Sequence, residues 1–266
     1  MKQRRAIHYK EIIDFLNEKF RETFNRPLKP RKFLMDFENA VIKSTREVWP
    51  ETKIQLCRVH CIRSWRKKIV EIFGQNFLEQ NPSMRLLWTA FRGIFFIPPT
   101  VFPMFLEFIE TEFRPKLPKT KFDTLLKYLS SNYFSTHAKY QPQFWSCYTD
   151  ISDFDDCTNS TNSIESLNRV LKDLCPQGKI TFRKCFETIH RFKCESLNKY
   201  NDAMFNDGMN SQGRETLRKK EATLDIMYQF SNQADLNNPK VLFNYCLKFA
   251  TYNIDAYEYD IIVQLC

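Results

Sequence analysis

Glycine is scarce in this chain. Only 5 of the 266 residues are glycine, about 2% of the chain, against a usual share of about 7%. They stand at Gly74, Gly93, Gly178, Gly208 and Gly213, and none of them completes a G-x-G-x-x-G or G-x-x-x-x-G-K-[ST] loop. The sequence therefore excludes the usual glycine-rich cradle for a dinucleotide or a nucleoside triphosphate.

Long apolar runs are lacking too. The longest uncharged run, residues 93–106, is interrupted by three prolines and is too short to span a bilayer. The charged start of the chain is not followed by the apolar region of a secretory signal. Together with 9 cysteines, this predicts a reducing compartment, no disulfides and no membrane partner.

The residues that are present predict a folded protein with a basic end. Hydrophobic residues make up 43% and aromatic residues 15% of the chain, enough for a substantial core. The formal net charge is +9, and residues 1–75, with 18 basic and 9 acidic side chains, account for nearly all of it. Such an excess fits either a nucleic-acid surface or an ordinary solvated basic face.

Hydrophobic periodicity predicts an α-β-α-β-α order near the start of the chain. Helices are expected at about 7–24, 38–48 and 62–73, and short strands at 32–36 and 53–59. A strand that follows a strand through a helix is normally parallel to it. Asp36 would then stand at the carboxyl end of the first strand.

Strand signals almost vanish after Gly74, and helical stripes replace them. Within residues 76–140 the apolar positions recur at helical spacing near 84–91, 101–109 and 122–129. A polar stretch covers residues 149–163. Further helices are expected at about 161–174, 182–200, 215–230 and 239–251.

Three local patterns stand in a fixed order along the chain. They are FLMDFENA at 33–40, CRVH at 57–60 and STNSIESLN at 160–168. In this order they resemble the transposase domain of Mutator-like elements (MULE), which carries D-F-E-x-A, C-x-x-H and T-N-N-x-x-E-x-x-N motifs. Residues 48–56 are also similar to that family's F-P-x-A-x-I-Q linker. The resemblance covers about residues 10–200.

The resemblance implies a ribonuclease H-like fold and divalent-metal-dependent cleavage and transfer of DNA strands. In that family two aspartates and a glutamate hold two Mg²⁺ or Mn²⁺ ions. Asp36 matches the second aspartate and Glu165 matches the glutamate, so these two are the expected catalytic and metal-binding residues. Hard cations of this kind take oxygen ligands, which suits carboxylates.

The resemblance also orders the domains. The expected fold is a mostly helical α/β protein with a partial ribonuclease H-like core, short parallel strands and an all-helical insertion. Residues 1–75 form the partial core, residues 76–150 the insertion, residues 151–200 the returning core helices with Glu165, and residues 201–266 a helical tail.

Cys57 and His60 match the family's C-x-x-H pair, an accessory motif that lies close to the active site. Each residue also has a plainer interpretation. Asp36 alone would be a helix cap or turn former, Glu165 could complete a capping box with Asn162, and Cys57 could be a small buried side chain. The sequence leaves these alternatives open.

A zinc site is a separate alternative. Cys57-x-x-His60 has the spacing of zinc ligands, and His190-x-x-x-Cys194 would place two more ligand types on one helical face. No close second C-x-x-C pair supports the interpretation.

The family's first catalytic aspartate, which ends a strand before the first helix, has no counterpart in residues 1–6. We therefore expect the chain alone to be inactive, and its two strands to need a partner or a preceding segment that completes the sheet. The acidic residues Asp153, Asp155 and Asp156 read better as a solvated loop than as a substitute ligand.

The expected partner is DNA, bound without sequence preference in the nucleus. Arg63, Arg66, Lys67 and Lys68 are the candidate phosphate contacts. The alternative function is a helical protein–protein interaction module of transposase ancestry, which would bind a protein through its aromatic-rich insertion. DNA binding should weaken steeply with salt, whereas an apolar contact should not.

Overall fold

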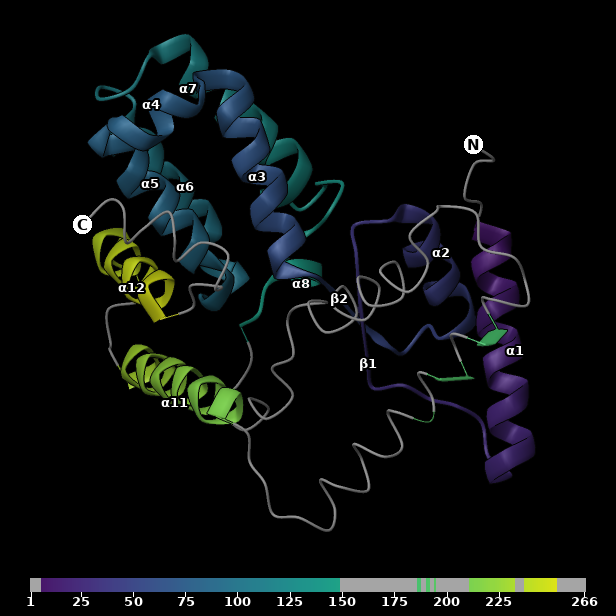
Figure 1. Ribbon diagram of the computed structural model, residues 1–266. Helices are drawn as coiled ribbons and strands as arrows, with labels where there is room; N and C mark the ends of the chain where they lie inside the picture. Colours follow the sequence, from purple (N-terminus) through teal and green to yellow (C-terminus); the bar gives the residue numbers. More distant parts are fainter. Residues whose placement is uncertain are drawn as a thin grey trace. The chain divides into compact units, whose positions relative to one another are not determined.

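A computed structural model describes residues 6–148, 186–187, 190–191, 194, 211–232 and 237–252 of the chain (Figure 1). The protein is mostly helical, with a small two-stranded parallel sheet, which confirms the predicted mixed, largely helical class. The described residues divide into two compact units, one within 1–160 and 223–266 and the other within 161–222. None of the described helices is both long and apolar enough to cross a membrane.

The chain begins with the predicted alternation of helices and strands. The elements are α1 (Ala6–Phe24), β1 (Lys32–Met35), α2 (Asn39–Val48), β2 (Lys53–Leu56) and α3 (Arg58–Phe73). The strands pair in parallel, with Lys32 opposite Lys53 and Met35 opposite Leu56. The prediction that the second strand reached residue 59 was wrong at its end, because α3 already begins at Arg58.

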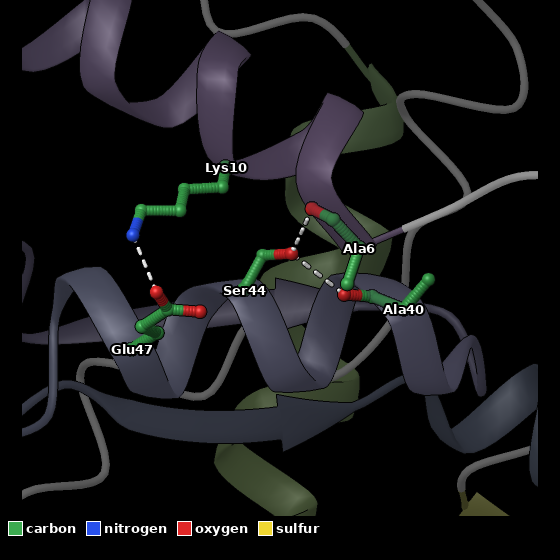
Figure 2. Close-up of polar contacts among 5 residues, drawn as sticks. All are labelled: Ala6, Lys10, Ala40, Ser44 and Glu47. Carbon is green, nitrogen blue, oxygen red and sulfur yellow. Dashed lines mark hydrogen bonds and ion pairs between the residues drawn. The ribbon is translucent and has the colours of Figure 1, made fainter.

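Helix α1 packs along α2, and polar contacts fix the pair (Figure 2). The Ser44 hydroxyl lies 2.6 Å from the Ala6 carbonyl oxygen of α1 and 2.8 Å from the Ala40 carbonyl oxygen of α2. Lys10 forms an ion pair with Glu47 along the same seam. Ile13 is the buried apolar residue of α1, so much of this helix pairing is polar.

Short helices follow α3 and form most of the apolar core. They are α4 (Gln75–Gln80), α5 (Pro82–Gly93), η1 (Ile94–Phe96), η2 (Pro99–Val101), α6 (Phe102–Phe113), α7 (Lys119–Leu129), η3 (Ser130–Phe134) and α8 (Pro142–Trp145). Prolines lie in the first turn of α5, η2, α6 and α8, where their missing N–H costs no helical hydrogen bond. The predicted stripes near 84–91, 101–109 and 122–129 correspond to α5, α6 and α7.

Aromatic rings fill the centre of this core. The fully buried Trp65 of α3 has its ring centroid 5.2 Å from that of Phe95 and 5.5 Å from that of Trp145. Trp145 stacks on Phe102 at 5.1 Å, and its indole N–H donates to the backbone oxygens of Tyr133 and Tyr140. Aromatic residues of the insertion therefore pack against one another and against α3.

Two further helices lie near the end of the chain. They are α11 (Ser211–Asn232) and α12 (Pro239–Tyr252), close to the predicted 215–230 and 239–251. Helix α12 packs against α5 and α6, and its Leu242, Cys246 and Phe249 are fully buried. At Gly93, the last residue of α5, an added Cβ would lie only 1.8 Å from the Cys246 carbonyl oxygen. The backbones of α5 and α12 thus approach each other where glycine leaves room.

Candidate functional site at the carboxyl edge of the sheet

The carboxyl ends of β1 and β2 meet at one edge of the parallel pair. Asp36 follows the last residue of β1, and Cys57 follows the last residue of β2. The Cys57 amide donates to the Met35 carbonyl oxygen at 2.8 Å, which continues the ladder one step beyond the strands. His60 lies in the first turn of α3, next to this edge.

Asp36, Cys57 and His60 form a cluster of three metal-ligand side chains, here called the edge cluster. Each residue offers one ligand atom, and these atoms all lie within 4.8 Å of one another. Asp36 Oδ1 and His60 Nδ1 are 3.2 Å apart. A carboxylate oxygen, a thiol sulfur and an imidazole nitrogen therefore converge on one point.

Burial in the edge cluster is graded. Cys57 has no exposed surface, whereas the His60 side chain is 30% exposed and the Asp36 side chain 55% exposed. His60 Nδ1 itself is shielded from solvent. The cluster thus has a closed side at the thiol and an open side at the carboxylate, so a ligand can enter past Asp36.

The loop that carries Asp36 is held from two directions. Tyr9 of α1 donates its hydroxyl to Glu38 Oε1 at 2.9 Å, and Tyr140 donates its hydroxyl to the Phe37 carbonyl oxygen at 3.2 Å. The rings of Phe37 and Tyr140 also meet edge to face, with centroids 4.8 Å apart. These contacts position the Asp36 backbone, and Glu38, whose carboxylate binds Tyr9, lies outside the edge cluster.

Strand β2 is tied to the helical body by a buried glutamine. Gln55, only 2% exposed, donates from Nε2 to the Ser146 carbonyl oxygen at 3.1 Å and to that of Phe144 at 3.4 Å. Because Cys57 lies two residues further on, this tie also fixes the buried end of the edge cluster.

Two further thiols lie close to Cys57. Cys61, on the next turn of α3, is fully buried, and that burial raises the pKa of its thiol well above the ordinary value, with smaller contributions from Cys147 and Cys57. All three cysteines are free thiols. Cys61 therefore packs as a buried apolar side chain beside the edge cluster.

The predicted phosphate contacts lie on α3, one turn and more beyond His60. Arg63 and Lys67 are exposed, and Arg66 is half-buried; their spacing of three and four residues places them on one helical face. Lys68 points elsewhere, because it pairs with Glu71 at 2.5 Å and lies 5.4 Å from the Tyr128 ring centroid. Three of the four predicted cations thus share a surface.

Several predicted residues fall outside the described part of the chain. Glu165 is one, and the acidic loop with Asp153, Asp155 and Asp156 is another. His190 and Cys194 are described in the second unit, where Nδ1 and Sγ lie 3.9 Å apart on one helical face.

A surface hollow lies at the other end of the strands. Its walls include Arg21 of α1, Arg31 before β1 and Trp49 after α2. These residues precede the strands or flank their amino ends, whereas the edge cluster lies at the carboxyl ends. The hollow is therefore separate from the candidate site.

Sequence reasoning named all three members of the edge cluster but assigned them to two different roles. Asp36 was expected among Mg²⁺ ligands, and Cys57 and His60 as an accessory pair. The position of two of these residues in the sequence could have grouped them, because Asp36 and Cys57 are each the first residue after one of two neighbouring parallel strands.

Comparisons with family models, with curated proteins and with solved structures found no match.

The donor set of the edge cluster does not fit a magnesium pair. Mg²⁺ demands oxygen ligands, and the cluster supplies a single carboxylate beside a thiol and an imidazole. Glu165, the other expected ligand, lies outside the described residues. This donor set therefore supports no Mg²⁺-dependent or Mn²⁺-dependent step.

Proposed function

We propose that this chain is a transposon-derived protein of Mutator-like transposase type, and that it binds DNA along α3. One observation carries the proposal: the residues of two separate family-like motifs, Asp36 and Cys57-x-x-His60, meet at the carboxyl edge of a parallel strand pair. The α-β-α-β-α order, followed by a helical segment, is what a partial ribonuclease H-like core with an insertion requires.

The proposed DNA contact is electrostatic. Arg63, Arg66 and Lys67 follow His60 on the same helix, and a helix rises about 1.5 Å per residue. These cations are therefore spread over roughly 5 to 10 Å of helix axis from His60, which matches the reach of a few backbone phosphates. A strand bound there would pass beside the edge cluster without any base being read.

Strand cleavage and transfer is the activity of the resembled family, whereas for this chain we propose DNA binding alone. The described residues supply one carboxylate, Asp36, of the three that the family's metal pair needs. Because the proposed partner is DNA, we also propose that the protein is nuclear.

The test is fluorescence anisotropy with a labelled duplex over a series of salt concentrations. Removing the basic face with Arg63→Ala, Arg66→Ala and Lys67→Ala together should weaken binding at least tenfold. It should also reduce the slope of log K against log salt by about 2 to 3, because each phosphate contact contributes about 0.9.

A matched control removes the same charge elsewhere. Lys116, Lys119 and Lys121 are exposed and lie before or within α7, so their triple alanine variant should bind DNA nearly as well as the wild type. Equal losses in the two triple variants, or tight binding that ignores salt, would show that α3 is not the DNA surface.

The alternative, a protein-interaction module, draws little support from the insertion's surface. Its aromatic side chains Phe91, Phe105 and Phe122 are fully buried. Of the large apolar side chains that are well exposed in the described residues, Leu86 is the one that comes from the 76–140 segment. An aromatic docking face on the insertion would require these side chains to turn outward.

A further inference from the structure

We propose that the edge cluster binds a zinc-class divalent ion, with Asp36, Cys57 and His60 as its three protein ligands. The inference goes beyond the proposed DNA-binding function and does not depend on it, because it needs only the donor atoms and their geometry.

The distance between two of the donor atoms matches the distance expected between two ligands of a zinc ion. Zinc–nitrogen and zinc–oxygen bonds of about 2.0 to 2.2 Å in a tetrahedral site place the two ligand atoms about 3.4 Å apart. Asp36 Oδ1 and His60 Nδ1 are 3.2 Å apart. One edge of the required tetrahedron is therefore already formed.

The thiol completes a triangle with that edge. A zinc–sulfur bond of about 2.3 Å requires roughly 3.6 Å between sulfur and a nitrogen or oxygen ligand, and the three ligand atoms lie within 4.8 Å of one another. At most about 1.2 Å of closure is needed between any two of these atoms.

The types of donor decide the class of ion. Thiolate and imidazole are ligands for zinc and for the neighbouring transition metals, whereas Mg²⁺ and Ca²⁺ take oxygen atoms. A donor set of one sulfur, one nitrogen and one oxygen therefore favours zinc and its neighbours over Mg²⁺ and Ca²⁺. The buried position of Cys57 also removes the thiol from bulk solvent.

Three protein ligands leave a fourth position on the bound ion. It would face the open side of the cluster, where Asp36 is exposed, and it would hold water or an incoming ligand, as in zinc centres with an open position. Zinc at this site would use one oxygen of the Asp36 carboxylate.

The experiment is a cobalt titration of the purified full-length chain, freed of tags and stripped with a chelator. Cobalt(II) takes the same tetrahedral sites as zinc and reports a thiolate ligand by a charge-transfer absorption in the near ultraviolet. The expected result is one Co²⁺ per chain with that absorption, displaced by one equivalent of Zn²⁺ and unaffected by millimolar Mg²⁺.

Two cysteine variants separate this site from a competing one. Cys57→Ser should abolish the charge-transfer absorption. Cys194→Ser removes an exposed thiol that lies 3.9 Å from His190 Nδ1, and it should leave the absorption unchanged. Absorption that survives Cys57→Ser or disappears with Cys194→Ser would overturn the proposal.

Asp36→Asn tests the metal site with a variant that should fold like the wild type. Its side chain is exposed, so circular dichroism and melting of this variant should match the wild type while its Co²⁺ affinity falls at least tenfold. An unchanged affinity would remove Asp36 from the site and overturn the three-ligand centre. The triple α3 variant should bind Co²⁺ normally, so that failure of DNA binding and failure of metal binding are distinguishable.

Discussion

Replacing Gly93 with alanine tests the close approach of α5 and α12. The new Cβ would lie 1.8 Å from the Cys246 carbonyl oxygen and 2.7 Å from its Cα. Ordinary contact begins at 3.4 Å, so the helices must separate by about 1.6 Å. The obstructing atoms are backbone atoms within α12, and a side-chain rotation cannot relieve the overlap.

The magnitude follows from what α12 buries. Overpacking alone costs about 1–3 kcal/mol. If α12 instead leaves α5, the fully buried Leu242 and Phe249 lose about 1.5–3 kcal/mol each. We therefore expect Gly93→Ala to lower the free energy of unfolding by about 1–3 kcal/mol if α12 stays docked and by at most about 3–6 kcal/mol if it leaves α5, which corresponds to a fall in Tm of roughly 2–24 °C.

The assay combines thermal melting with hydrogen exchange of residues 239–252. Leu86→Ala is the matched control, because Leu86 lies on the same helix with its side chain exposed and should change stability by at most about 0.5 kcal/mol. Helix propensity by itself favours alanine over glycine by about 1 kcal/mol. An unchanged or raised Tm for Gly93→Ala would therefore refute the close approach of the two backbones.

Three other substitutions should also affect stability. Gln55→Leu leaves the buried Ser146 carbonyl oxygen and the part-buried Phe144 carbonyl oxygen without their donor and should cost about 1–3 kcal/mol in urea unfolding. Ser44→Ala removes the hydroxyl contact between α1 and α2 and should cost about 0.5–1.5 kcal/mol by the same measurement. The hydrogen bond from Lys10 lowers the pKa of Glu47, so this pair's contribution is present above the unfolded pKa and is lost as the pH falls through the folded one. Melting in low salt should thus decline more on acidification below pH 4.5 for the wild type than for Glu47→Gln, and added salt should reduce that difference.

Much of the secondary structure follows from periodicity. The apolar stripe Met84, Leu87, Trp88 and Phe91 predicts α5, and all four of these side chains are buried. The strand at 32–36 was visible as a short apolar run that ends in a carboxylate. The strand at 53–59 was predicted too long, because Arg58, Val59 and His60 alternate in polarity as a strand would, yet form the first turn of α3.

The sequence did not predict which helices pack against each other. Periodicity identifies the apolar face of α12, but the same face would suit many neighbours, and only the folded structure pairs it with α5. Gly93 was a signal in retrospect, since a glycine near the end of a helix permits a close backbone approach. In the sequence it is indistinguishable from a helix stop.

The candidate site was half predictable. Parallel strands place Asp36 and Cys57 at one edge, and both residues were identified on sequence grounds. His60 was expected beyond a longer strand, so its position on the first turn of α3, facing Asp36 at 3.2 Å, required the structure. That position adds an imidazole nitrogen to the oxygen and sulfur donors of the edge cluster.

All three donors of the edge cluster come from one strand–helix–strand–helix segment, within residues 36–60. Closing such a short loop loses less chain entropy than joining distant parts of the sequence. The contact of α12 with α5, by contrast, joins distant parts of the sequence. An ion bound at the edge cluster would therefore constrain only a short stretch of chain, residues 36–60.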